Sequence, residues 1–231
     1  MRFTNRTDAG RQLAARLEHF ARRSDTTVLA LPRGGVPVAF EIASSLGLPL
    51  DVFLVRKLGV PGQAELAMGA IAAGGIEVLN EDLIRELDIP RALVEQVAVR
   101  ERLELERRDR AYRGGRGAPY VRDRHVLLVD DGLATGATMQ AAILALRQHS
   151  PASIVVAVPV GPRDTCERLG RLADRVECLS MPELFQAVGV WYEAFDQTSD
   201  DEVRRLLSAQ GDSPRNTPGA GAPAGTARLW L

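Results

Sequence analysis

A chain of 231 residues with 45% hydrophobic residues is long enough to bury the core of one large domain or two small ones. Its 29 basic and 30 acidic side chains nearly cancel, so net charge gives no overall attraction to nucleic acid or to an anionic membrane. No stretch approaches the ~18 consecutive apolar residues of a membrane span, and the charged start MRFTNRTDAGRQ lacks the apolar core of a signal peptide. We therefore expect a cytoplasmic protein that binds neither nucleic acid nor membrane and meets any polyanion at a local site.

The two cysteines and three histidines form no known redox or metal-binding motif. Cys166 and Cys178 fit neither the CxxC spacing nor that of a zinc knuckle, and two reduced structural thiols are the simpler interpretation. His19, His125 and His149 are scattered without an HExxH or similar grouping. Chemistry therefore has to come from carboxylates, basic side chains and loops.

The first part of the chain alternates helical patterns with short apolar runs. Thr7 or Asp8 is a plausible N-cap for an amphipathic opening helix. The run TTVLALPRGG is β-branched and apolar and closes on a proline and two glycines, as a strand and its turn do. The expected elements are a helix to residue 23, a strand within 26–35, a helix over 36–47 and a second strand within 48–59.

The same alternation returns after residue 124. The expected elements are strands within 125–132, 151–160 and 175–179, and helices over 136–148 and 164–173. Apolar runs of four or five residues separated by helices are typical of a parallel sheet covered on both faces. We therefore predict an α/β, doubly wound, mainly parallel sheet, with the ligand crevice at the carboxyl ends of its strands.

Residues 74–124 interrupt this alternation. A long helix is predicted between Pro90 and Gly114, with opposite charges four residues apart such as Glu104 and Arg108. Because acids and bases alternate along it, a solvated face, with an interface as an alternative, is favoured over a nucleic-acid stripe. We expect a helical insertion at about 80–116.

The remaining boundaries follow from composition. Residues 1–210 are expected to form a single domain whose small C-terminal hood spans about 180–200. Residues 211–231 are rich in Gly, Pro and Ala and too poor in apolar side chains to order themselves, so we expect a flexible tail.

The stretch HVLLVDDGLATGAT, residues 125–138, combines two carboxylates with a loop suited to phosphate. Gly136 permits a tight turn at the start of a helix, where backbone N-H groups converge on phosphate oxygens, and Thr135 and Thr138 add hydroxyl donors. Asp130 and Asp131 would repel a phosphate and must face sugar hydroxyls or a divalent metal held jointly with the ligand. A ribose 5-phosphate satisfies both ends of this stretch.

Rival motifs fail at specific positions. The loop lacks the lysine and the spacing of a Walker A motif, and no GxGxxG follows a predicted strand. GLATG matches the frame of the GxSxG nucleophile elbow, but Ala134 stands at the serine position and carries no nucleophilic atom. Serine-hydrolase chemistry at this loop is therefore excluded.

VLLVDDGLATGAT resembles the signature by which type I phosphoribosyltransferases bind phosphoribosyl pyrophosphate (PRPP). Together with PRGG, VRKLGVPG and AVGVWYEAFDQ, it makes the chain similar to a bacterial group of phosphoribosyltransferases of unassigned substrate, over about residues 26–205. The resemblance implies the type I phosphoribosyltransferase fold, a Mg²⁺ cofactor, PRPP as a substrate and a homodimer.

The resemblance also implies roles for individual residues. The acidic pair would hold the ribose hydroxyls and reach Mg²⁺ through the ligand or water, and the loop after it would wrap the 5-phosphate. Arg33 and Lys57 would act with the acidic pair in catalysis, on the diphosphate. A solvated turn for Arg33 and a surface pair for Arg56 and Lys57 are the alternatives. The implied PRPP-binding residues are Arg33, Gly34, Arg56, Lys57, Asp130, Asp131, Ala134, Thr135, Gly136, Ala137 and Thr138.

The acceptor is left open. Hypoxanthine-guanine enzymes of the family carry an aspartate where this chain has Ala134, so a purine assignment does not follow. Acceptor recognition in the family belongs to the hood, where Phe185, Trp191 and Tyr192 could stack a planar base. Simple packing of these rings against the sheet is the alternative.

The leading hypothesis is transfer of the 5-phosphoribosyl group from PRPP to a nitrogenous acceptor, a nucleobase or related heterocycle, with release of pyrophosphate. The alternative is a regulatory protein that senses PRPP or a nucleotide without turnover. A nucleic-acid-binding regulator on the same fold is disfavoured by the near-zero net charge and the alternating charges of the long helix.

Overall fold

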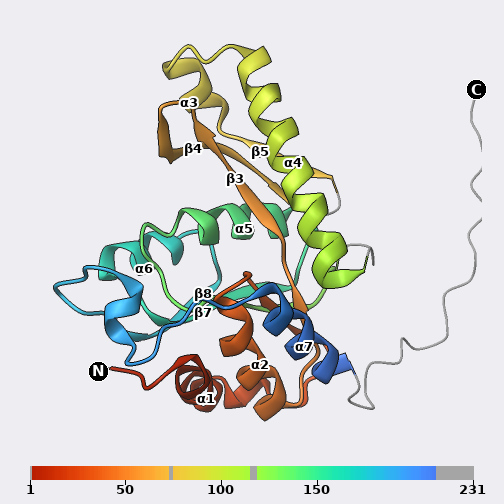
Figure 1. Ribbon diagram of the computed structural model, residues 1–231, viewed down its shortest axis with the longest axis vertical. Helices are drawn as coiled ribbons and strands as arrows, with labels where there is room; N and C mark the ends of the chain where they lie inside the picture. Colours follow the sequence, from red (N-terminus) through yellow and green to blue (C-terminus); the bar gives the residue numbers. More distant parts are fainter. Residues whose placement is uncertain (1, 73–74, 115–118, 212–231) are drawn as a thin grey trace, which may run out of the picture.

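The computed structural model describes residues 2–72, 75–114 and 119–211. Two sheets organise this part of the chain: a five-stranded sheet in the body, and a three-stranded sheet that stands above it beside a long helix (Figure 1). The tail predicted over 211–231 lies outside the described residues, except for Gly211, which is the last residue of a helix.

The larger sheet is entirely parallel, with strand order β2-β1-β6-β7-β8. Helices connect or cover these strands, which confirms the predicted α/β fold. The strands are β1 (Thr26–Ala30), β2 (Leu50–Val52), β6 (His125–Val129), β7 (Ser153–Val160) and β8 (Arg175–Ser180). The helices are α1 (Arg6–Arg16), η1 (Glu18–Phe20), α2 (Gly35–Leu46), α5 (Ala137–Arg147), α6 (Arg163–Leu169), η2 (Val188–Trp191) and α7 (Asp200–Gly211).

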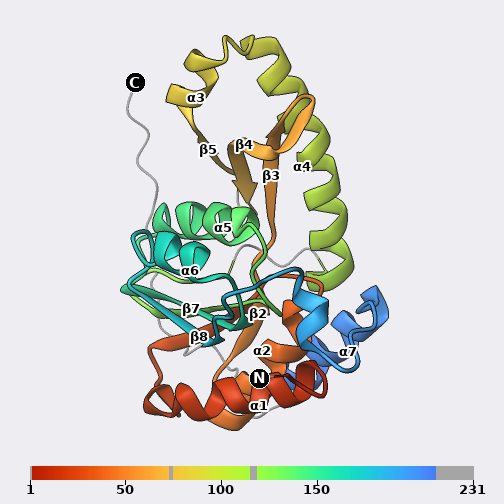
Figure 2. The ribbon, with the colours of Figure 1, turned by 90° about the vertical axis from the view of Figure 1, so that its left-hand side faces the viewer.

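Each face of this sheet has its own core. Val28 on β1 belongs to the core shared with α1, α2 and α7, whereas its neighbour Leu29 belongs to the core shared with α5 and α6. The alternation follows from the two-residue repeat of a strand. Figure 2 shows α1 and α2 on one side of the sheet and α5 and α6 on the other.

The connections leave the centre of the sheet in opposite directions. The chain passes from β1 through α2 to the edge strand β2, and from β6 through α5 to β7 on the other side. β1 and β6 are neighbours, and the N-H of Leu31 donates to the carbonyl of Val129 at 2.8 Å just beyond their ends. This is the switch point at which open α/β sheets bind ligands.

The second sheet was not predicted. It is antiparallel, with order β3-β4-β5, and follows β2 directly. The single strand predicted over 48–59 is wrong, because Phe53 and Leu54 bridge two strands in different sheets. Both side chains are buried, so the apolar run continues across the break and hides it. The strands are β3 (Val55–Val60), β4 (Gln63–Ala72) and β5 (Ile76–Leu79).

The predicted long helix is present as α4 (Arg91–Arg113), preceded by the short α3 (Glu81–Glu86). It ends at Gly114, whose φ of 61° suits a glycine C-cap. Its apolar face packs in the same core as β3 and β4, and the guanidinium of Arg113, 3% exposed, pairs with both carboxylate oxygens of Asp51 at 2.9 Å. The helix is therefore anchored to the body at its C-terminal end.

The start of the chain is tied to the hood. Asn5, rather than Thr7 or Asp8, caps α1, since its Oδ1 accepts from the N-H of Asp8 at 2.9 Å. Just before it, the N-H of Phe3 donates to the carbonyl of Trp191 at 2.8 Å. The sequence pattern of an amphipathic helix does not predict this contact, because Phe3 and Trp191 lie far apart in the sequence.

No helix in the described ranges is both long enough and apolar enough to cross a membrane.

Candidate functional site at the switch point

The loops after β1 and β6 meet with almost no space between them. A Cβ atom added to Gly34 would lie 2.0 Å from Oδ2 of Asp131, and one added to Gly35 would lie 2.7 Å from the carbonyl oxygen of Val129. At Gly35 the clash is with backbone atoms, so a side chain would push the two loops apart, whereas at Gly34 the carboxylate of Asp131 would have to move. The PRGG and DDG motifs thus form one structural unit.

The acidic pair lies in an uneven electrostatic environment. Oδ2 of Asp131 accepts from Nε of Arg6 at 2.8 Å and lies 2.7 Å from its Nη2. Oδ1 of Asp130 accepts from the N-H of Asp131 at 2.8 Å. Burial, and then the charge of Asp131, raise the pKa of Asp130 well above its usual value. Asp131 therefore has a cationic partner, whereas Asp130 holds its negative charge at a cost.

This cost predicts a pH-dependent gain in stability for Asp130→Asn. Because the pKa is higher in the folded chain, the folded state binds the proton more tightly. The unfolding free energy should therefore fall by ~1.4 kcal/mol per pH unit as the pH rises from the unfolded-chain pKa of about 4 through the raised folded pKa. In denaturant titrations without ligand, we expect Asp130→Asn to match the wild type near pH 3 and exceed it at pH 8.

Asparagine keeps an Oδ1 that can accept from the N-H of residue 131, so the packing is preserved. Asp196→Asn is the matched control: its side chain is exposed, and only its backbone carbonyl contacts Arg6, at 2.7 Å. A variant at Asp130 less stable than wild type at pH 8 would contradict the prediction.

Arg6 is a site residue that the sequence analysis missed. Its guanidinium carbon lies 3.9 Å above the centre of the Phe195 ring, and its side chain is 12% exposed. The ring and the carboxylate of Asp131 together fix the cation. In the sequence, Arg6 is one of many charges on an amphipathic helix, and nothing near it marks a partner 125 residues away.

The predicted aromatic residues of the hood have different surroundings. The Tyr192 ring, 2% exposed, lies 5.5 Å from that of Phe3 and 4.8 Å from that of Phe195, so its faces are occupied by packing. Its hydroxyl donates to the carbonyl oxygen of Asp131 at 2.6 Å. Tyr192 thus supports the acidic pair, rather than offering a face for base stacking as predicted.

Phe185 and Trp191 are partly buried and pack against the same hood cluster. Nε1 of Trp191 is a buried donor with no hydrogen-bond partner among the described residues. It thus retains an unused donor.

The predicted phosphate loop leads directly into α5. Gly136, at φ 74°, precedes the first helical residue, and a Cβ there would lie 2.7 Å from Cγ2 of Thr165. Nη2 of Arg168 donates to the carbonyl of Thr135 at 2.5 Å. Two side chains of α6, Thr165 and Arg168, therefore support the loop. The sequence did not predict this support. Ala134, Thr135 and Thr138 are exposed, and Ala137 is half-buried.

Arg33, in the loop after β1, contacts the first residue of α7. The peptide bond between Pro32 and Arg33 is cis. Nη1 of Arg33 lies 3.4 Å from Oδ1 of Asp200, which also accepts from the Tyr112 hydroxyl at 2.7 Å. Burial and that hydrogen bond raise the pKa of Tyr112 to about 12. Asp200 thus joins the Arg33 loop to α4.

The basic residues of β3 line a cavity of about 740 Å³. Arg56 and Lys57 line it together with Pro32 from the loop after β1, Thr138 from α5, and Arg108 among other residues of α4. Nε and Nη2 of Arg56 donate to Oε2 of Glu101 on α4 at 2.8 and 2.5 Å. Of the predicted site residues, Arg56, Lys57 and Thr138 therefore line one hollow, whereas Thr135 and Ala137 line a separate cavity of about 570 Å³. Neither Arg33 nor the acidic pair is among the described residues that line these two cavities.

The protein alone offers few ligands for a metal. No group of three or more His, Cys, Asp and Glu side chains with metal-binding geometry occurs within 2–72, 75–114 and 119–211. The pair Asp130 and Asp131 supplies carboxylate oxygens, but Oδ2 of Asp131 is occupied by Arg6. These donors suit a hard cation such as Mg²⁺ only when a ligand completes its shell.

These loops define an α/β protein in which a predicted phosphate loop and an acidic pair meet at the switch point, with Pro32 and Thr138 of the same loops lining a basic hollow. The sequence pattern of the phosphoribosyl transferase domain matches residues 62–193. The chain therefore belongs to the phosphoribosyltransferase family, and the predicted family is confirmed.

Individual relatives agree with this assignment. "Putative phosphoribosyl transferase Rv0571c" and "Putative phosphoribosyl transferase MT0597", from two strains of Mycobacterium tuberculosis, are each 51% identical over 205 residues, which is 89% of this chain. The chain spans 46% of the length of these relatives. The crystal structure of TT1426 from Thermus thermophilus is 43% identical, with a TM-score of 0.83 over 91% of this chain and 99% of that one.

Proposed function

We propose that the protein transfers the 5-phosphoribosyl group of PRPP to a nitrogenous acceptor and releases pyrophosphate. The observation that carries the proposal is the contact between two loops: Gly34 of PRGG lies against the carboxylate of Asp131. Pro32 and Thr138, close to these two residues in the chain, line the basic hollow. PRPP has a 5-phosphate, ribose hydroxyls and a diphosphate at C1. These groups match the predicted phosphate loop, the acidic pair and the basic hollow, in that order.

The chemistry would proceed by breaking the bond between C1 and the diphosphate while the acceptor nitrogen bonds to C1. Asp130 and Asp131 would orient the ribose hydroxyls, and residues 134–138 would hold the 5-phosphate. Arg33 and Lys57 would offset the charge that grows on the leaving group. When bound with PRPP, Mg²⁺ would supply further charge neutralisation of the diphosphate.

We propose that the hood binds the acceptor. It contacts the acidic pair through the hydrogen bond from the Tyr192 hydroxyl to the carbonyl oxygen of Asp131. Since the Tyr192 ring is enclosed, Trp191 and Phe185 remain the candidate contacts for a heterocycle. We retain residues 1–210 as one catalytic unit and a homodimer as the proposed assembly.

The proposal is tested by base-dependent release of pyrophosphate from PRPP with Mg²⁺ present, across a panel of purines, pyrimidines and carboxylated heterocycles. We expect turnover with at least one acceptor and none without acceptor. PRPP binding without turnover across the panel would instead favour a sensor, and absence of both would contradict the proposal.

A further inference from the structure

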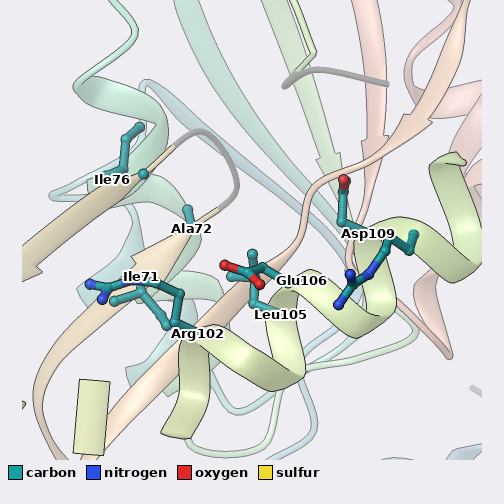
Figure 3. A pocket seen from close by; sticks show the side chains of 9 residues that line it. Ile71, Ala72, Ile76, Arg102, Leu105, Glu106 and Asp109 are labelled. Carbon is teal, nitrogen blue, oxygen red and sulfur yellow. The ribbon is translucent and has the colours of Figure 1, made fainter. Parts of the chain in front are cut away.

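The two cavities beside α4 differ in charge. A cavity of about 310 Å³ is lined by two cations, Arg102 and Arg110, and two acids, Glu106 and Asp109, so its charges balance. Figure 3 shows Arg102, Glu106 and Asp109 along this face of α4. The 740 Å³ cavity lies on the opposite face of the helix. Among the described residues that line it, cations outnumber acids: Arg56, Lys57, Arg100 and Arg108 against Glu101. The second cavity therefore favours an anion.

Arg108 is the cation of α4 that lies next to both predicted ligand loops. It also lines a small adjoining cavity together with Pro32, Arg56 and Thr138. Pro32 belongs to the predicted diphosphate loop and Thr138 to the phosphate loop. A cation of the inserted helix thus lies where these two loops approach each other.

The helix is held in a fixed position at this point. The Tyr112 hydroxyl, one turn beyond Arg108, donates to Asp200, and Arg113 pairs with Asp51. Nε of Arg108 donates to Oε1 of Glu104 at 2.7 Å, and its side chain is 29% exposed. These contacts orient the guanidinium before a ligand arrives, which lowers the entropic cost of binding.

We propose that Arg108 binds the diphosphate group of PRPP, so that α4 forms a wall of the active site. The inference rests on the proposed function and adds a binding residue from outside the recognised motifs. A guanidinium can donate two parallel hydrogen bonds to phosphate oxygens and retains its charge throughout the reaction. Arg108 would then stabilise the released diphosphate more strongly than the bound ester, because charge grows on that group.

The neighbouring Arg107 provides a matched control. Its Nε donates to Oε2 of Glu104 at 2.8 Å, so each of the two arginines supports the same carboxylate. Arg107 is 55% exposed and is not among the described residues that line either of the cavities containing Arg108. Arg107→Gln and Arg108→Gln therefore remove the same kind of ion pair but differ at the hollow.

The test is calorimetric titration of the full chain with PRPP, inorganic diphosphate and ribose 5-phosphate, with Mg²⁺ present. Arg108→Gln should weaken PRPP and diphosphate binding by roughly 10- to 100-fold and leave ribose 5-phosphate unchanged. Arg107→Gln should leave all three unchanged. Arg108→Lys, which keeps the charge without the planar donors, should fall between them and provides a milder variant should Arg108→Gln fold poorly.

The outcomes separate the two proposals. Wild-type binding of PRPP that Arg108→Gln and Arg107→Gln affect equally would overturn the role of Arg108 alone. A wild type that binds neither PRPP nor diphosphate would contradict the proposed function and this inference with it.

Discussion

Replacing Asp130 and Asp131 together by asparagine should lower PRPP affinity by at least ~100-fold, about 3 kcal/mol, while the domain stays folded. Each substitution removes a charged acceptor for a ribose hydroxyl and keeps the size of the side chain. The loss should be seen by calorimetry with Mg²⁺, and pyrophosphate release should disappear with it.

Stability separates this effect from unfolding. Asp130→Asn is expected to stabilise the folded chain at neutral pH, because the carboxylate it replaces has a raised pKa. Asp131→Asn acts in the other direction, since it leaves Arg6 without the carboxylate that it contacts at 2.7 Å. The control Asp196→Asn should retain wild-type affinity. Unchanged PRPP binding in the double variant would remove the acidic pair from the site.

The opposite effects expected for the two aspartates fit a site that is kept at the expense of stability. A half-buried carboxylate with a raised pKa is unfavourable for folding, and an asparagine would suit the same space better. Asp130 is therefore better explained by ligand binding than by packing. Asp131, paired with Arg6 and supported by the Tyr192 hydroxyl at its carbonyl, also has a structural role.

The larger sheet and the loop after β6 were predictable because their signals are local. Strand-length apolar runs, helical repeats and a Gly/Thr-rich turn are read within a few residues of one another. Hence Asp130, Asp131 and the loop to Thr138 could be assigned to one site from the sequence alone. Even so, β3, β4 and β5 were missed, because antiparallel pairing depends on partners that the short runs do not specify.

Contacts between distant segments explain the rest of the difference. Arg6 reaches Asp131, and Asp200 reaches both Arg33 and Tyr112, across separations of 88 to 167 residues. A charged residue in an amphipathic helix gives no sign of such a partner. The alternating charges of α4 predicted a solvated face, yet Arg108 on that helix lines the cavity beside the phosphate loop.

Gly34→Ala should disable the site through a single methyl group. Gly34 has φ −58° and ψ −34°, which alanine adopts readily, so the backbone itself is not strained by the change. The added Cβ would lie 2.0 Å from Oδ2 and 2.5 Å from Cγ of Asp131. We expect a loss of ~1–3 kcal/mol in unfolding free energy and at least a tenfold loss in PRPP affinity.

Both ways of relieving this clash damage the site. If Asp131 rotates away, it leaves Arg6, and if the loop moves, Arg33 leaves Asp200. Gly170→Ala is the control, since Gly170 has φ −63° and its added Cβ would meet no atom closer than 3.4 Å. It should match wild type in both assays.

Adding Asp131→Ala to Gly34→Ala distinguishes contact from a general loop defect. Without the carboxylate, the new methyl group has space, so the double variant should be destabilised by less than the sum of the two single changes. PRPP affinity should remain low, because the acid itself is gone. Additive losses of stability, measured by denaturant titration, would show that Gly34 does not act through Asp131, and would separate the two loops that the proposed site joins.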